Sequence, residues 1–194
     1  VPLASSLHES FQRIETVLTR RETHGSAIAG TTWGLRDLDR LTQGTHGSQL
    51  IIIAARPACG KTSVALKAAR AAAQFTGKPV LFFSLEMSRV ELTDRLLSGE
   101  SRVDAARIKS GMLSQDDMTA LTRAANDLQH VQIHIDDTGE RTVAEMRATA
   151  RRMKAQHGLA AVVIDYLQIV KVAKSTGGPS NREQEIGQVS RGLK

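Results

Sequence analysis

Residues 49–62 read QLIIIAARPACGKT, and this stretch decides the expected fold. Residues 49–55 form a continuous apolar run, which predicts a β-strand covered on both faces, as in a parallel sheet. The run leads into Gly60, Lys61 and Thr62, and the residues that follow predict a helix from Lys61 to about Phe75. A buried strand, a short loop and a helix that begins at Gly-Lys-Thr are typical of a phosphate-binding loop.

The expected loop offers both charge and hydrogen-bond donors to a nucleoside triphosphate. Backbone N–H groups and the helix N-terminus would bind the phosphates, with Lys61 at the β and γ oxygens and the Thr62 hydroxyl on Mg²⁺. Ala55 stands where the usual pattern has its first glycine, so an ordinary helix start with an exposed lysine is the alternative. The residues expected to bind nucleotide are Ala55, Arg56, Pro57, Ala58, Cys59, Gly60, Lys61, Thr62 and Ser63.

Further along the chain, apolar runs predict strands at residues 80–85, 131–136 and 161–165. Helices are expected between them, because a serine or threonine followed three residues later by an acid forms a capping box. These pairs are Ser88 with Glu91, Ser114 with Asp117, and Thr142 with Glu145. Alternating strands and crossover helices predict an α/β fold with a parallel sheet and right-handed connections.

Two aspartates at strand ends compete for the Mg²⁺ position. Asp165 follows a continuously apolar run that predicts a central strand, whereas Asp136 ends a run that alternates with polar residues, as a half-exposed strand does. We therefore prefer Asp165. Asp136 and Asp137 precede Thr138 and Gly139 and are expected in a turn or cap. A solvated carboxylate at the strand end is the alternative for Asp165.

Glu86 is the candidate general base. It lies just past the strand at residues 80–85, and in parallel sheets ligands sit at the carboxyl ends of the strands. There it could orient and deprotonate the water that attacks the γ-phosphate. Its position alone suits a carboxylate at a helix start slightly better than a catalytic base.

The N-terminal region predicts an amphipathic helix at residues 6–21. Its apolar side chains recur on one face, and Ser6 with Glu9 would form its capping box. These apolar residues are Leu7, Phe11, Ile14 and Leu18. A lone helix of this length is marginal in water, so it is expected to dock, either on its own domain or on a neighbour, through a linker at residues 23–32.

The composition is globular and basic, with 41% hydrophobic residues and a net charge of +6 in 194 residues, which favours one sizeable domain and a polyanionic partner. The single cysteine cannot form an internal disulfide, and no apolar run is long enough to span a bilayer, so we expect a cytoplasmic protein. Residues 171–182 predict a glycine-containing loop. A last helical pattern starts near Glu183 and stops at Lys194, so we expect a fragment.

Three segments, in this order and spacing, closely resemble the DnaB family of replicative DNA helicases. They are IAARP with GKT within residues 53–62, FSLEM at residues 83–87, and IDYLQ at residues 164–168. Residues 35–41 (LRDLDRL), 101–104 and 186–194 (IGQVSRGLK) resemble the same family.

The resemblance implies a RecA-like P-loop NTPase core with a mostly parallel sheet flanked by helices, preceded by an amphipathic linker helix. Residues 1–25 would be the linker helix, docking on an adjacent subunit, and residues 26–194 the ATPase domain, incomplete at its C-terminal side. The implied activity is ATP hydrolysis that drives 5′-to-3′ movement on single-stranded DNA and unwinds duplex. The implied cofactors are ATP and Mg²⁺, and the implied partners are single-stranded DNA, further copies in a homo-hexamer joined through residues 6–21, a primase and a helicase loader.

The resemblance also assigns roles to residues. Lys61 and Glu86 would be catalytic, and Thr62 and Asp165 would hold the metal. DNA contacts would fall to the loop after Asp165, at Lys171, Lys174 and Arg182, for which a solvated surface loop is the alternative. The family's γ-phosphate sensor and arginine finger would lie beyond Lys194, so the fragment alone is expected to hydrolyse ATP poorly.

Two other functions remain open at this stage. One is a recombination or repair ATPase of the same fold, which would form filaments on DNA without unwinding it. The other is a non-motor module for ring assembly or loader binding, in which residues 6–21 carry the activity.

Overall fold

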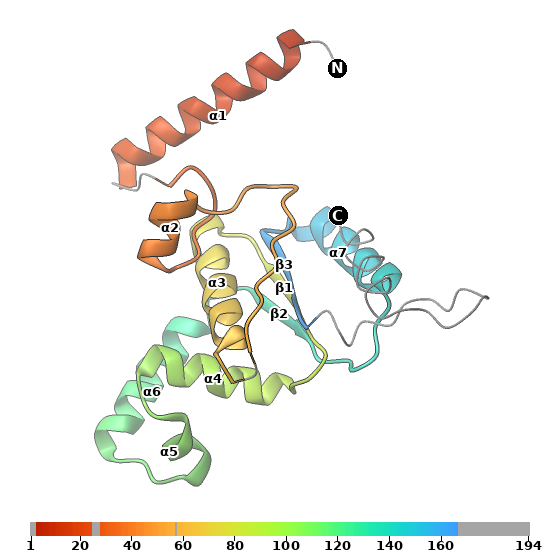
Figure 1. Cartoon of the computed structure of the whole chain (residues 1–194). Helices are drawn as coiled ribbons and strands as arrows, with labels where there is room; N and C mark the ends of the chain where they lie inside the picture. The colour runs from red at the N-terminus through yellow and green to blue at the C-terminus, as the bar shows by residue number, and fades with distance from the viewer. Residues whose placement is uncertain (1–2, 25–27, 57, 167–194) are drawn as a thin grey trace, which may run out of the picture.

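The computed structural model describes residues 3–24, 28–56 and 58–166 of the chain (Figure 1). The N-terminal part contains α1 (Leu3–His24), α2 (Arg36–Thr42) and α3 (Lys61–Thr76). The middle of the chain forms β1 (Val80–Ser84), α4 (Arg89–Ser101), α5 (Ala105–Ser110) and α6 (Gln115–Leu128). The last described elements are β2 (Ile133–Asp136), α7 (Val143–His157) and β3 (Ala161–Asp165).

The sheet is parallel, with the strand order β2-β1-β3. Val80 of β1 lies opposite both Ile133 and Ala161, and at the other end Ser84 lies opposite Asp165. All five residues of β1 are buried, as expected of a central strand. The predicted α/β fold with a parallel sheet is confirmed, and the carboxyl ends of the strands share one edge.

Helices cover both faces of the sheet. Alternate side chains of β1 point to opposite faces, so each set packs against different helices. Val80 and Phe82 pack against α3 and α4, while Leu81 and Phe83 pack against Met146 of α7. Figure 1 shows α3 and α7 on opposite sides of the strands. The residues that α3 buries against Val80 and Phe82 include three with small side chains, Ala69, Ala72 and Ala73.

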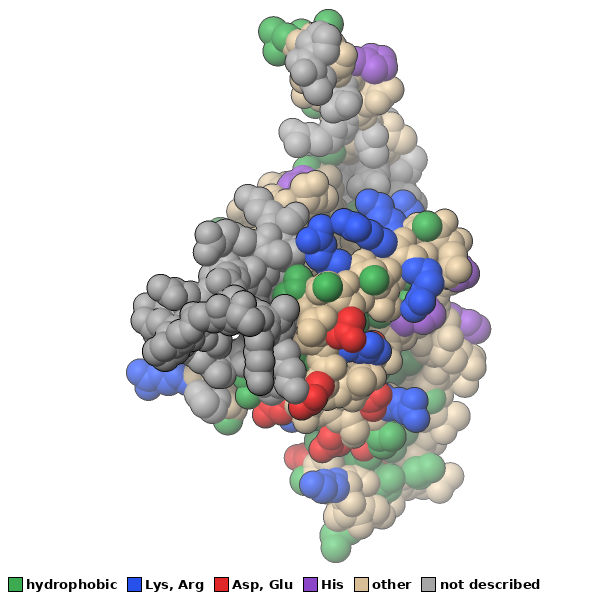
Figure 2. Space-filling view, turned by 90° about the vertical axis from the view of Figure 1, so that its right-hand side faces the viewer, with side chains coloured by type: hydrophobic (Ala, Val, Ile, Leu, Met, Phe, Trp, Pro, Cys, Tyr) green, Lys and Arg blue, Asp and Glu red, His purple; other side chains and the backbone are tan. Residues whose placement is uncertain are grey.

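The outer side of α7 is basic. Arg147, Arg151, Arg152 and Lys154 are exposed, and Figure 2 shows Lys and Arg side chains on this side of the molecule. None of the four takes part in an ion pair within the described part of the chain.

Three capping boxes predicted from the sequence are confirmed. Ser88, Ser114 and Thr142 each accept a hydrogen bond from the backbone N–H three residues later and are bonded in return by the acid there. Hydrogen bonds from the backbone and hydroxyl of the capping residue lower the pKa of Glu91, Asp117 and Glu145.

The expected capping box at Ser6 and Glu9 is wrong. α1 already begins at Leu3, so Ser6 lies inside the helix. Neither glycine nor proline stands between Leu3 and Ser6, so nothing stops the helix from extending toward the N-terminus.

The strand expected at residues 49–55 is also wrong. The structure has no strand there, and the side chains of Leu50, Ile51, Ile52 and Ile53 are between 38% and 59% exposed. A strand covered on both faces needs hydrogen-bonded neighbours along its edges. Among the described strands the free edges are those of β2 and β3, and residues 49–55 pair with neither. The apolar run therefore lacks the pairing that its composition implies.

The end of the expected linker belongs to the folded domain. Thr31 and Thr45 form an antiparallel bridge, and the N–H of Gly30 donates to the carbonyl oxygen of Gln43 at 2.9 Å. A side chain at Gly30 would lie 2.4 Å from the Thr45 carbonyl oxygen, so only glycine fits this close approach.

The buried carboxylate of Asp39 in α2 holds the preceding residues, Thr32 and Trp33, by hydrogen bonds. Asp39 accepts hydrogen bonds from the Trp33 N–H and the Thr32 hydroxyl, at 2.7 and 2.6 Å. The Trp33 ring is buried as well, and its Nε1 donates to the Thr42 hydroxyl at 3.1 Å. These contacts fix α2 to the chain that precedes it.

Several expectations lie outside the described residues. These are Pro57, the loop carrying Lys171, Lys174 and Arg182, and the helix expected from Glu183. No helix in the described part is long and apolar enough to cross a membrane.

Candidate phosphate-binding site

The N-terminus of α3 is the centre of the candidate site. Gly60 is the N-cap residue at φ 82°, and Ala58 two residues earlier has φ 62°. The left-handed conformation at Gly60 turns the chain sharply into the helix, where a residue with a side chain would be strained. The Val64 N–H then donates to the Gly60 carbonyl oxygen at 3.0 Å, which closes the first helical turn.

No side chain caps this helix end, and its first turn has no acidic residue. In contrast, α4, α6 and α7 all supply their own capping hydroxyl and acid. The first N–H groups of a helix need acceptors, and the helix dipole favours a negative charge beside them. The α3 terminus is therefore open to an external anion, as a phosphate site requires.

Thr62 and Asp165 come together across the sheet edge. The Thr62 Oγ1 donates to Oδ2 of Asp165 at 2.6 Å, although the two residues are 103 positions apart. Asp165 is 8% exposed, and its carbonyl oxygen accepts the N–H of Leu85 at 2.9 Å. A hydroxyl and a carboxylate at this separation offer Mg²⁺ two oxygen ligands of the kind it prefers.

Lys61 directly precedes Thr62 of this pair in the sequence and contacts the residue after Asp165. Its Nζ is 5.4 Å from the centre of the Tyr166 ring, which follows Asp165 directly. The sequence analysis assigned Tyr166 no role of its own, although Tyr166 follows Asp165 directly and belongs to the segment IDYLQ that resembles the DnaB family.

Glu86 lies at the same edge of the sheet. It follows Leu85, whose N–H is bonded to the Asp165 carbonyl, and Glu86 is exposed. The backbone thus places Glu86 beside the carboxyl end of β3 and within the same edge as the start of α3. This is the edge where a bound triphosphate would lie.

Asp136 is engaged elsewhere. It ends β2, on the far side of β1 from β3, and accepts from Arg141 Nη2 at 2.9 Å and from the Thr138 N–H at 3.1 Å. Burial disfavours its charge, but the hydrogen bonds from Thr138 and the charge of Arg141 outweigh this and lower its pKa. Asp137 accepts the N–H of Arg89 at 3.0 Å. Both acids therefore have structural partners, as the turn-or-cap interpretation expected.

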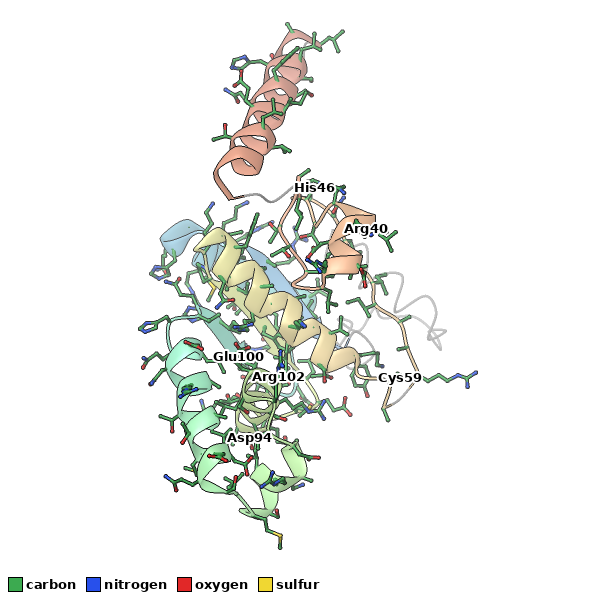
Figure 3. All side chains as sticks on the ribbon, turned by 90° about the vertical axis from the view of Figure 1, so that its left-hand side faces the viewer. Arg40, His46, Cys59, Asp94, Glu100 and Arg102 are labelled. Atoms are coloured by element: carbon green, nitrogen blue, oxygen red, sulfur yellow. The ribbon has the colours of Figure 1, made fainter. Side chains whose placement is uncertain are left out.

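The rest of the predicted loop is open. Arg56, Ala58 and Cys59 are exposed, and Figure 3 shows Cys59 on the loop that leads into α3. Within the described residues no three His, Cys, Asp or Glu side chains gather as a metal site. A cation here would depend on Thr62, Asp165, phosphate oxygens and water, which suits Mg²⁺ because it keeps several waters.

Comparison with known proteins places this chain in a family. A family model described as the DnaB-like helicase C terminal domain matches residues 30–194. The chain belongs to this DnaB-like helicase family. The resemblance based on the three sequence segments is thereby confirmed.

The relatives of this DnaB-like domain agree with the assignment. The chain is 41% identical over 196 residues to the replicative DNA helicase DnaB of Nostoc sp., covering 100% of this chain and 21% of the relative. A solved structure of an ATPase domain matches with a TM-score of 0.84 at 30% identity, over 99% of this chain and 65% of that one.

A second structure, of a DnaB-like replicative helicase described with its interactions with primase, matches with a TM-score of 0.79 at 31% identity, over 94% of this chain and 43% of that one. This chain thus spans less than half of the length of the curated relatives it matches, for example 40% of the replicative helicase of Geobacillus stearothermophilus.

Proposed function

We propose that this chain is the motor part of a replicative DNA helicase, which binds ATP with Mg²⁺ and hydrolyses it to move along single-stranded DNA and separate duplex. The observation that carries the proposal is the 2.6 Å hydrogen bond from Thr62 to Asp165 beside an α3 N-terminus that has no side-chain cap. Membership of the DnaB-like family supports the same function.

Each residue of the site has a chemical task in this proposal. The N–H groups at the start of α3 bind the phosphates, and Lys61 adds a positive charge at the β and γ oxygens. Thr62 and Asp165 would hold Mg²⁺, which neutralises charge on the phosphates when it is bound. Glu86 orients the attacking water and accepts its proton.

The assembly proposed is a homo-hexamer joined through α1. The apolar stripe of α1 consists of Leu7, Phe11, Ile14 and Leu18, which are between 50% and 63% exposed. Figure 1 shows α1 standing apart from the α/β body. Burying the exposed part of these four side chains would contribute about 3 to 7 kcal/mol, so docking on a neighbouring copy would stabilise the assembly. A primase and a loader are further proposed partners.

The proposed DNA contacts are Lys171, Lys174 and Arg182. Replacing all three with alanine should lower the slope of log affinity against log salt by roughly two units, because about three phosphate contacts are lost. Arg95, Lys109 and Arg123, exposed on α4, α5 and α6, make a charge-matched control that should leave the slope unchanged. An unchanged slope in the first variant would show that Lys171, Lys174 and Arg182 belong to a solvated surface loop and do not contact DNA.

Unwinding of a forked DNA substrate by the uninterrupted polypeptide tests the proposed function. The wild type should separate the fork only with ATP and Mg²⁺, and Lys61→Ala should neither bind ATP nor unwind. A protein that hydrolyses ATP and coats DNA without opening the fork would be a recombination or repair ATPase instead. A protein that assembles normally and functions despite Glu86→Ala would be a non-motor module.

A further inference from the structure

The Lys61 ammonium has an aromatic partner instead of an acidic one. Its Nζ lies 5.4 Å from the centre of the Tyr166 ring, within the range over which a ring attracts a cation. In the described part of the chain no carboxylate is within ion-pair distance of Lys61. Asp165, the acid directly before Tyr166, accepts the Thr62 hydroxyl through its Oδ2 instead.

Two adjacent contacts therefore connect the same two elements. Lys61 and Thr62 open α3, while Asp165 and Tyr166 end β3 and continue from it. Thr62 is joined to Asp165 by a hydrogen bond, and Lys61 to Tyr166 by the attraction between a cation and a ring. The first contact positions the proposed metal ligands, and the second positions the charge for the phosphates.

The nature of this partner matters for binding. A carboxylate beside Lys61 would neutralise the charge and compete with phosphate for the same ammonium. A ring attracts the ammonium from one side only and carries no full negative charge, so the N–H donors that point away from the ring stay available for phosphate. The ring thus positions the Lys61 ammonium and leaves N–H donors free to bind phosphate oxygens.

We propose that Tyr166 is a positioning residue that holds the Lys61 ammonium for the β and γ oxygens of a bound triphosphate. This inference rests on the proposed nucleotide site. In this proposal the aromatic face of Tyr166 attracts the Lys61 ammonium, and the Tyr166 hydroxyl takes no part. Tyr166 therefore sets the affinity for the triphosphate group itself, independently of the base and ribose.

The test is binding of inorganic tripolyphosphate with Mg²⁺, measured by calorimetry on the 194-residue chain. Tyr166→Phe keeps the ring and should bind within about twofold of the wild type, whereas Tyr166→Leu should bind about three- to tenfold more weakly. If Tyr166→Leu binds tripolyphosphate as tightly as Tyr166→Phe does, the proposal is overturned.

A second series guards against a folding defect in Tyr166→Leu. Phenylalanine analogues with increasing numbers of fluorine atoms at position 166 keep the shape of the ring but withdraw charge from its face. Tripolyphosphate affinity should fall stepwise with each fluorine, and equal affinity across the series would refute the proposal. One further result is that the wild type binds tripolyphosphate, Lys61→Ala does not, and Tyr166→Leu binds as tightly as the wild type. That result would support the phosphate site and refute only the role of the Tyr166 ring. If the wild type does not bind tripolyphosphate, the phosphate site and the role of the ring are both refuted.

Discussion

Thr62 donates a 2.6 Å hydrogen bond to Asp165, which fixes the first turn of α3 to the carboxyl end of β3. The sheet order explains how residues so distant in sequence can meet. β3 pairs with β1 in parallel, and α3 packs over the same strands, so the start of the helix and the end of the strand share one edge. Because α3 and β3 hold the two side chains together, they need little rearrangement when charge develops.

Replacing Thr62 with valine should abolish this pair while keeping the side-chain shape. We expect ATP hydrolysis to fall by about a hundredfold or more, because a proposed ligand of Mg²⁺ is lost, and binding of ATP with Mg²⁺ to weaken. Thr62→Ser keeps the hydroxyl and is the matched control. Hydrolysis should be measured over a titration of Mg²⁺, and a valine variant with the wild-type Mg²⁺ dependence would exclude Thr62 as a ligand.

Glu86→Gln separates binding from catalysis. The amide keeps the size of the side chain but cannot accept the proton of the attacking water, so turnover should fall about 10²- to 10⁴-fold while ATP affinity is retained. Asp94→Asn, on the exposed side of α4 (Figure 3), removes one carboxylate away from the proposed site and should change neither quantity. Single-turnover hydrolysis by the uninterrupted polypeptide is the measurement, and robust turnover by Glu86→Gln would assign the base elsewhere.

The apolar stripe of α1 should decide assembly. Phe11→Asp places a charge in the middle of the stripe, and we expect the proposed hexamer to dissociate because burying an unpaired carboxylate is costly. Met112→Asp is the control, since Met112 is 76% exposed but lies after α5, away from the stripe. Sedimentation velocity reports the mass. A hexamer that survives Phe11→Asp would show that α1 docks through another face or on its own domain.

The pair of Asp136 and Arg141 should make stability depend on pH. The folded pKa of Asp136 is lowered, so its contribution is present above the unfolded value of about 3.9 and is lost as the pH falls through the folded value. Asp136→Asn should cost about 1 to 2 kcal/mol at pH 7. Urea unfolding of both proteins should show this difference shrinking below about pH 4. A difference that is constant with pH would mean that the ionised form of Asp136 has no special partner.

The sequence was a good guide wherever a local pattern set the structure. The hydroxyl-and-acid spacings at Ser88, Ser114 and Thr142 predicted helix starts, because a capping box is complete within four residues. Contrast between continuous and alternating apolar runs favoured Asp165 over Asp136, and the structure brings only Asp165 to Thr62. The contact between Lys61 and Tyr166 was not predicted, since it depends on how far α3 and β3 approach in space.

The run at residues 49–55 shows where such patterns fail. Its apolar residues satisfied the pattern of a buried strand, but strand formation also needs partners along the edges, which composition does not encode. The same limit applies to Ser6, since a capping residue marks a helix start only if the preceding residues leave the helix.

Ile52→Thr tests whether the apolar run contributes to the fold of this chain. Ile52 is 59% exposed and pairs with no strand in the described structure, so the variant should change the free energy of unfolding by no more than about 0.5 kcal/mol. Val80→Thr is the matched control, because it puts the same hydroxyl into β1 at a fully buried position and should cost about 1 to 3 kcal/mol. Urea unfolding of the 194-residue chain gives both values. If Ile52→Thr costs as much as Val80→Thr, residues 49–55 are buried in solution and the strand predicted from the sequence forms after all.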